Sequence, residues 1–225
     1  MIIALIGFMG CGKSSVGREL ARLLCCPFMD LDEVIEERSG RSIPEIFATD
    51  GEAAFRQMEV EALHNIVVHP VDSVGPLPAS WVPPPSRGWQ NANSIHQAYT
   101  PLLPDGQCNA VMALGGGTVM TKECAEMVRE HTTCIYLRTG VETLVERLSD
   151  EADGRPMLGC TSSPAPAGMS LRGAERRGNL RARIEELMAL RSGTYEHTAH
   201  MIVDTDGKTI EEVAEEIHGI LMKKC

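Results

Sequence analysis

Residues 7–14 combine closely spaced glycines with a lysine and a hydroxyl side chain. The run Gly7-Phe8-Met9-Gly10-Cys11-Gly12-Lys13-Ser14 matches the pattern G-x-x-x-x-G-K-[ST], in which backbone N–H groups surround phosphate oxygens. It lies between an apolar run at residues 2–6 and a stretch with helical spacing, which is the context that the pattern requires. We therefore predict a loop that binds a nucleoside triphosphate, with Lys13 on the β- and γ-phosphates and the Ser14 hydroxyl on Mg²⁺.

Two carboxylates, Asp30 and Asp32, end the next apolar run, which we predict to be a strand over residues 27–31. Their spacing places both side chains on one side of a strand. In a parallel sheet, ligands bind beyond the carboxyl ends of the strands, where the predicted phosphate loop also lies. One carboxylate can hold Mg²⁺ through water, while the other accepts a proton from an attacking hydroxyl.

Two further groups suit the binding of a small anion. Arg56 and Glu59 are three residues apart on a predicted helix, so Glu59 can hold the Arg56 guanidinium in place. Three successive glycines, residues 115–117, follow another apolar run and indicate a close approach of backbone to ligand.

The formal charge of the chain is −10, which disfavours nucleic acid and anionic membrane as partners. An anionic ligand therefore has to be bound by a local group of basic side chains.

Apolar runs alternate with helical patterns along the chain, which predicts an α/β fold with a parallel sheet between two layers of helices. The strands are predicted at residues 2–6, 27–31, 110–114, 133–137 and 201–203. Ser42 with Glu45, and Thr209 with Glu212, have the spacing of a capping box at a helix start. Helices are expected from residue 43 to about 63, over 141–148 and 180–191, and after residue 209.

Two stretches interrupt this alternation. Residues 69–109 are rich in proline and hold both tryptophans, so we expect a surface insertion, either without regular structure or binding a partner through Trp81 and Trp89. Residues 150–179, rich in Gly, Ser, Pro and Arg, are expected to form a mobile lid. We predict a single domain over residues 1–225, with neither a signal peptide nor a membrane-spanning segment.

The eight cysteines include no C-x-x-C pair, and we expect reduced thiols, as in the cytoplasm. Cys11 lies inside the predicted phosphate loop. Surrounding N–H groups could lower its pKa and make it reactive, a hypothesis that maleimide labelling with and without ATP would test.

In their order and context, these motifs resemble the shikimate kinase family. The resemblance covers roughly residues 1–68, 110–158 and 180–221. It rests on the phosphate loop, Asp30-Leu31-Asp32, residues 42–47, residues 51–56 with Glu59, the glycines at 115–117, Arg155-Pro156-Met157-Leu158, and Arg191 ahead of Tyr195.

The resemblance implies roles for individual residues. The acceptor would be bound by Asp32, Arg56, Gly116, Gly117 and Arg191, of which the two arginines grip the shikimate carboxylate. The nucleotide would be bound by Gly10, Cys11, Gly12, Lys13, Ser14, Ser15, Arg147 beside the adenine, and Arg155 on the transferring phosphate. Lys13, Asp32 and Arg155 would be catalytic, and Ser14 and, through water, Asp30 would hold Mg²⁺.

The fold that the resemblance implies is a three-layer P-loop sandwich with a five-stranded parallel sheet and a mobile lid. The reaction that the resemblance implies is the transfer of a phosphoryl group from ATP to shikimate. It yields shikimate 3-phosphate and ADP on the route to chorismate and the aromatic amino acids. We expect a cytoplasmic monomer. Two alternatives remain at this point: a kinase of the same fold for gluconate or a nucleoside monophosphate, and a non-catalytic nucleotide sensor.

Overall fold

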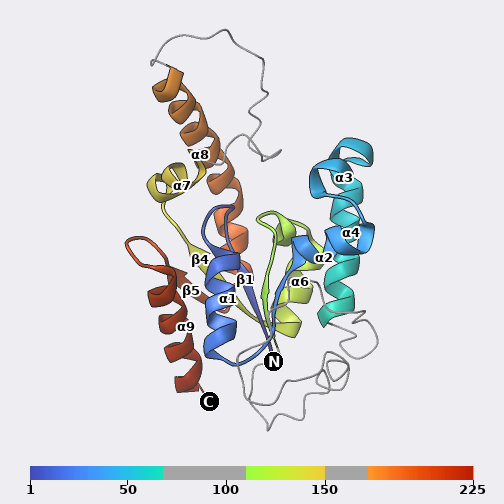
Figure 1. Cartoon of the computed structure of the whole chain (residues 1–225), viewed down its shortest axis with the longest axis vertical. Coiled ribbons are helices and arrows are strands. Elements are labelled where there is room, and N and C mark those ends of the chain that lie inside the picture. The colour runs from blue at the N-terminus through green and yellow to red at the C-terminus, as the bar shows by residue number, and fades with distance from the viewer. Residues whose placement is uncertain (68–109, 150–171, 225) are drawn as a thin grey trace.

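The computed structural model describes residues 1–67, 110–149 and 172–224, and of residues 172–178 and 224 only the backbone (Figure 1). The predicted insertion at 69–109 and the predicted lid up to residue 171 therefore lie outside the described residues. Within the described ranges, no helix is long and apolar enough to cross a membrane.

The centre of the fold is a five-stranded sheet in which all paired strands run parallel, as predicted. Its strands have the order β2-β3-β1-β4-β5. They are β1 (Ile2–Ile6), β2 (Phe28–Asp30), β3 (Ala110–Ala113), β4 (Thr132–Arg138) and β5 (Met201–Asp204). Because consecutive strands are parallel, each must be joined to the next by a crossover, and helices form most of these connections.

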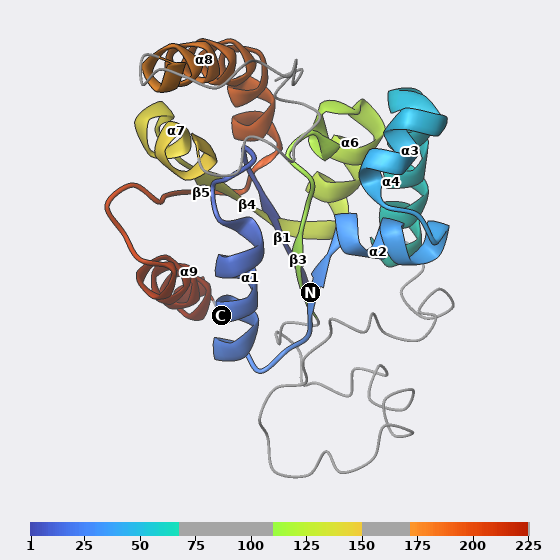
Figure 2. The same cartoon turned by 45° about the horizontal axis from the view of Figure 1, so that its top comes forward.

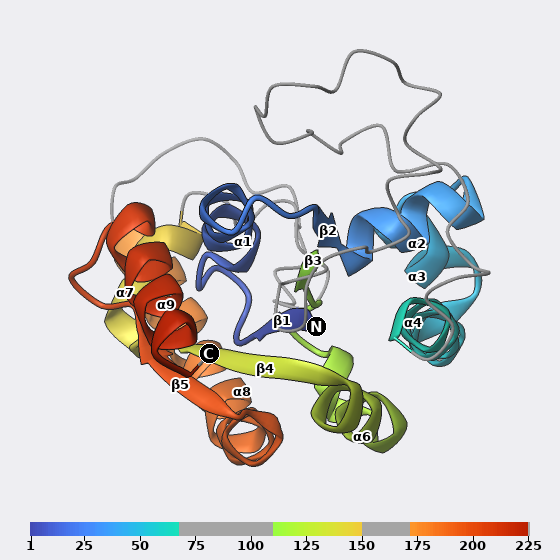
Figure 3. The ribbon, with the colours of Figure 1, turned by 90° about the horizontal axis from the view of Figure 1, so that it is seen from below.

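The alternation of side chains along β1 divides the interior into two cores. Ile3 and Leu5 pack with α1 (Lys13–Leu23) and α9 (Ile210–Lys224), whereas Ala4 and Ile6 pack with α4 (Gly51–Val67) and α6 (Lys122–His131). Seen from below, α1 and α9 cover one face of the sheet, and α6 and α8 (Arg172–Thr198) cover the other (Figure 3). The three-layer prediction is confirmed.

Both predicted capping boxes are present. Before α3 (Ile43–Thr49), the Glu45 carboxylate accepts a hydrogen bond from the Ser42 backbone N–H at 2.8 Å. Before α9, Glu212 accepts from the Thr209 N–H at 2.8 Å, and the Thr209 hydroxyl accepts from the Glu212 N–H at 3.2 Å. Side chains at the start of each helix thus accept hydrogen bonds from backbone N–H groups that have no partner within the helix.

The predicted second strand is wrong at its end. β2 stops at Asp30, and Leu31 already begins α2 (Leu31–Ser39). The cause is local, because the Asp30 carboxylate caps this helix and accepts a hydrogen bond from the Asp32 N–H at 3.1 Å. Asp32 is therefore a first-turn helix residue, and strand alternation was the wrong reason to pair the two carboxylates.

Helices account for the other differences from the predicted elements. The sequence analysis predicts neither α2 nor α6. Few residues of these helices are both apolar and buried, and in α6 only Cys124 and Val128 are. The predicted helix from residue 43 to 63 is broken at Gly51, whose φ is +82°, into α3 and α4. α8 extends beyond the predicted 180–191 at both ends. The strand ends differ by at most one residue otherwise.

Removing buried volume from the core under α1 tests the packing. Leu20 is 0% exposed, so Leu20→Ala should lower the free energy of unfolding by about 2–5 kcal/mol. Leu190→Ala is the matched control, because that side chain is 71% exposed and its loss should cost under about 0.5 kcal/mol. Urea denaturation measures both. Equal losses for the two variants would contradict the described packing.

Candidate active site

The carboxyl edge of the sheet carries a cavity of about 740 Å³. In Figure 2, α7 (Val141–Ser149) and α8 lie on one side of the segments that follow β1 and β3, and α3 and α4 lie on the other. The cavity lining brings together all the predicted site residues that the structure describes: Gly10, Cys11, Gly12, Lys13, Ser14, Ser15, Asp30, Asp32, Arg56, Gly116, Gly117, Arg147 and Arg191. Arg155 lies outside the described residues.

The glycine loop joins β1 to α1, as predicted, and needs glycine at three positions. Gly7, Gly10 and Gly12 have φ values of +146°, +79° and +95°, which residues with a Cβ rarely adopt. The Lys13 ammonium donates hydrogen bonds to the carbonyl oxygens of Gly7, at 3.0 Å, and Phe8, at 2.9 Å. The loop therefore holds the lysine charge at its own centre, where phosphate oxygens can reach it.

Cys11 lines the cavity, and its Sγ lies 3.8 Å from the Lys13 ammonium nitrogen. The residue is 1% exposed and belongs to the core cluster under the loop. A reactive, accessible thiol is therefore not favoured by the structure, and maleimide should label Cys11 slowly with or without ATP.

Ser14 and Asp30 place two oxygen ligands side by side. The Ser14 hydroxyl donates to the Asp30 carboxylate at 2.6 Å, from the start of α1 to the end of β2. Mg²⁺ prefers oxygen ligands and is bound by one or two carboxylates together with substrate phosphates and water. The donor set at this point fits that ion.

Asp32 has a carboxyl group with an unusual environment. Its Oδ1 is buried and has no hydrogen-bond partner among the described residues. Burial, together with the negative charges of Asp30 and Glu59, raises the pKa of Asp32 to about 7, although Lys13 opposes the shift. A carboxyl group that titrates near neutral pH is suited to accept a proton from a substrate hydroxyl.

Arg56 is held by carboxylates of its own helix, α4. Its Nη1 contacts Glu59 Oε2 at 2.6 Å, and its Nη2 contacts Glu52 Oε1 at 3.0 Å. Glu59 is 0% exposed, and its other oxygen accepts from the Thr118 hydroxyl at 2.5 Å. A Cβ at position 117 would lie 2.7 Å from Arg56 Nη2, so a larger residue there would displace the guanidinium. The predicted Arg56–Glu59 pair is thus present.

Arg191 comes to the same cavity from α8. It is 7% exposed, and its Nη1 is buried without a hydrogen-bond partner in the described part of the chain. Its guanidinium lies 5.9 Å from the centre of the Phe8 ring. One turn later, the Tyr195 hydroxyl donates to the Gly116 carbonyl oxygen, and burial raises the pKa of Tyr195, which keeps this donor protonated. A buried cation with a free donor is a site for an anion.

Most of this chain matches the model of one protein family. The family model described as "Shikimate kinase" matches residues 9–75 and 88–221. The chain belongs to the shikimate kinase family. The break in the match, at residues 76–87, lies within the predicted insertion at 69–109.

Individual shikimate kinases are similar over nearly the whole chain. That of Thermus thermophilus is 34% identical over 215 residues, which cover 96% of this chain and 86% of the relative. That of Chlorobaculum tepidum is 34% identical over 216 residues, covering 96% and 87%. Among solved structures, the Aquifex aeolicus enzyme matches with a TM-score of 0.62 at 26% identity, covering 100% of this chain and 98% of the other.

A second solved structure supports the fold. The Acinetobacter baumannii shikimate kinase, solved in complex with shikimate, matches with a TM-score of 0.70 at 24% identity and covers 99% and 93% of the two chains. Together these matches confirm the prediction of an ATP-dependent shikimate kinase. They favour it over a kinase of another small acceptor and over a non-catalytic sensor.

Several cavity residues were missed by the sequence analysis. At one end, the apolar side chains of Ile43, Phe47 and Phe55 line the cavity beside Arg56. At the other end the lining consists of Thr205, Lys208, Thr209, Ile210 and Val213, next to Arg147. The position of this second group after β5 was available as a signal, because the carboxyl ends of all parallel strands meet at one edge.

The raised pKa of Asp32 makes a prediction for stability. In the unfolded chain an aspartate titrates near its usual value of 3.8, whereas in the folded protein the pKa is about 7. The folded state therefore binds the extra proton between these values, and the contribution of Asp32 to stability falls as pH rises through this range. Asp32→Asn removes that penalty, so its thermal midpoint should rise relative to the parent protein from about pH 4.5 to about pH 8. A difference between the two midpoints that does not change with pH would contradict the shifted pKa.

Proposed function

We propose that this chain transfers the γ-phosphoryl group of ATP to the 3-hydroxyl of shikimate, releasing shikimate 3-phosphate and ADP for aromatic amino acid biosynthesis. The observation that carries the proposal is one cavity that contains both the phosphate loop and two arginines from distant elements, Arg56 and Arg191. Family membership supports the same reaction.

At the nucleotide end, the phosphates bind to the loop residues from Gly10 to Ser15. Backbone N–H groups at the start of α1 and the Lys13 ammonium offset the phosphate charge. The adenine lies between Arg147 and the segment after β5, because that is where the same cavity continues. This arrangement points the γ-phosphate toward Asp32.

At the acceptor end, the carboxylate of shikimate binds between Arg56 and Arg191. Planar guanidinium groups match a carboxylate with two parallel donors, and both groups are partly or fully removed from water, which strengthens the contact. The backbones of Gly116 and Gly117 approach the ligand closely because no side chain intervenes. A chain with a net charge of −10 needs such local cations to bind this anion.

In the transfer step, the shikimate hydroxyl oxygen forms the bond to the γ-phosphorus as the bond from phosphorus to the ADP oxygen breaks. The proton of the hydroxyl passes to the Asp32 carboxylate, whose pKa of about 7 makes it a base near neutral pH. Lys13 stabilises charge on the phosphate oxygens. Arg155 stays a prediction for the same role.

Mg²⁺ is proposed to be held by the Ser14 hydroxyl and, through water, by Asp30, whose oxygens lie together. When bound, the ion offsets negative charge on the phosphates. We further propose that residues 1–225 act as one kinase domain and as a cytoplasmic monomer, with the segments at 69–109 and 150–179 as insertion and lid.

The reaction is tested by an acceptor screen. The protein is mixed with ATP, Mg²⁺ and one acceptor at a time, and ADP release is followed. Shikimate should give turnover well above the rate without acceptor, whereas gluconate and nucleoside monophosphates should not. ADP release that is independent of shikimate would reject the proposal.

Arg56→Ala should weaken shikimate binding by about one to two orders of magnitude, since a charge-assisted hydrogen bond is worth about 1.5–3 kcal/mol. ATP binding should be unchanged, because Arg56 lies at the acceptor end. Titration calorimetry with each ligand measures both. Arg41→Ala is the matched control, since Arg41 pairs with Asp50 outside the cavity lining. Equal weakening of both ligands by Arg56→Ala would instead indicate damage to α4.

Asp32→Asn should leave the affinities for ATP and shikimate within about threefold of the parent protein but reduce kcat by about two to four orders of magnitude, the range for loss of a general base. Steady-state kinetics and equilibrium titrations together measure this. A variant with near-normal kcat would remove Asp32 from the chemistry.

A further inference from the structure

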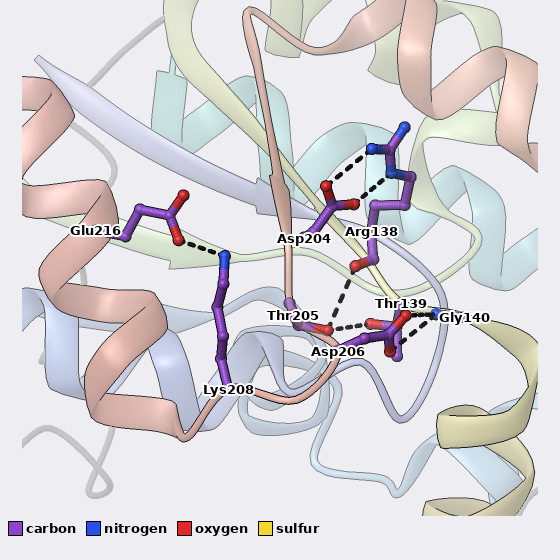
Figure 4. Close-up of polar contacts among 8 residues, drawn as sticks. All are labelled: Arg138, Thr139, Gly140, Asp204, Thr205, Asp206, Lys208 and Glu216. Carbon is purple, nitrogen blue, oxygen red and sulfur yellow. Dashed lines mark hydrogen bonds and ion pairs between the residues drawn. The ribbon is translucent and has the colours of Figure 1, made fainter.

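Beside the cavity, hydrogen bonds join the turn that follows β4 to the turn that follows β5 (Figure 4). The hydroxyl groups of Thr139 and Thr205 lie 2.6 Å apart, and both residues are 2% exposed. The Thr205 N–H donates to the Arg138 carbonyl oxygen at 2.9 Å. These contacts extend the β4–β5 pairing past the last strand residues.

Asp206 adds a contact between the turn after β5 and the start of α7. Its two carboxylate oxygens accept from the Gly140 N–H at 2.9 and 3.1 Å. Gly140 is the residue before α7, and its carbonyl accepts from the Leu144 N–H at 3.1 Å. A carboxylate from another segment thus sits at the positive end of α7, where it is stabilising.

The close contact depends on residue 140 being a glycine. A Cβ at this position would lie 2.7 Å from Asp206 Oδ2. The Asp206 carboxylate and the backbone of Gly140 are therefore in direct contact, which joins the two turns.

α7 in turn contacts the phosphate loop. Arg147 Nη1 donates to the Gly10 carbonyl oxygen at 3.4 Å. A Cβ on Gly10 would lie 2.9 Å from Leu148 Cδ2, so Leu148 packs directly on the loop. Asp206 consequently connects the segment with Thr205 and Lys208, at the nucleotide end of the cavity, to the helix that rests on the phosphate loop.

We propose that Asp206 is a positioning residue for the nucleotide. Asp206 is absent from the described cavity lining, and it acts by fixing α7 relative to the segment after β5. The inference rests on the proposed function, in which the nucleotide lies between Arg147 of α7 and the segment after β5. It implies that loss of the carboxylate loosens ATP binding and leaves the acceptor end, on the far side of the phosphate loop, unaffected.

The neighbouring residue Asp204 provides a matched control. Its carboxylate binds Arg138 at 2.5 and 2.9 Å, but both side chains are about half exposed, and Asp204 is absent from the described lining. Asp204→Asn removes the same charge two residues away from Asp206. It therefore separates a general electrostatic effect from the specific contact with Gly140.

The experiment measures the dissociation constants of ATP and shikimate by calorimetry for Asp206→Ala, Asp206→Asn, Asp204→Asn and Arg147→Ala. Asp206→Ala should weaken ATP binding about threefold to tenfold, the fold-change for one hydrogen bond of typical net strength. Asp206→Asn keeps one acceptor oxygen and should fall between this variant and the parent. Asp204→Asn should change ATP binding less than about twofold, and shikimate binding should stay within about twofold throughout.

Three outcomes would overturn the proposal: ATP affinity unchanged in Asp206→Ala, equal effects of Asp206→Asn and Asp204→Asn, or equal weakening of ATP and shikimate. If Asp206→Ala does not fold, Asp206→Asn decides the same question. Arg147→Ala tests the nucleotide placement separately. Weaker ATP binding in Arg147→Ala with an unaffected Asp206→Ala would reject only the positioning role, whereas an unaffected Arg147→Ala would reject the placement itself.

Discussion

A fully buried carboxylate has to be neutralised where it lies, and in this protein that carboxylate belongs to Glu59. The Arg56 guanidinium and the Thr118 hydroxyl satisfy its two oxygens. This requirement holds Arg56 at the cavity wall, where its guanidinium lies close against the backbone of Gly117. The same negative charge helps to raise the pKa of Asp32. One buried charge thus acts on both Arg56, which we propose to bind the acid, and Asp32, which we propose to accept the hydroxyl proton.

The site depends, second, on the parallel sheet, because the sheet brings segments that are far apart in sequence together at one edge. The phosphate loop follows β1, Asp30 ends β2, residues 115–117 follow β3, and the segment with Thr205 follows β5. Arg191 reaches the same point from α8, where its buried Nη1 has no partner among the described residues. Shape and charge at this edge suit a nucleotide at one end and a small carboxylate at the other.

Much of this could be predicted from the sequence. The phosphate loop has a fixed spacing and a strand on one side, and Arg56 with Glu59 have helical spacing, so local rules were enough. The pairing of Asp30 with Asp32 was predicted for the wrong reason, since Asp30 caps a helix that begins one residue later. α6 was missed because its face toward the core is narrow. The lining by Ile43 and Phe47 arises from tertiary packing, which no local pattern encodes.

The central claim is that ATP and shikimate occupy opposite ends of one cavity, with the acid held by two arginines. A crystal structure with a non-hydrolysable ATP analogue and shikimate tests it directly. The account predicts the shikimate carboxylate within hydrogen-bond distance of both the Arg56 and the Arg191 guanidinium, and a ring hydroxyl between Asp32 and the terminal phosphate. Shikimate bound with its carboxylate away from both arginines, or outside this cavity, would contradict it.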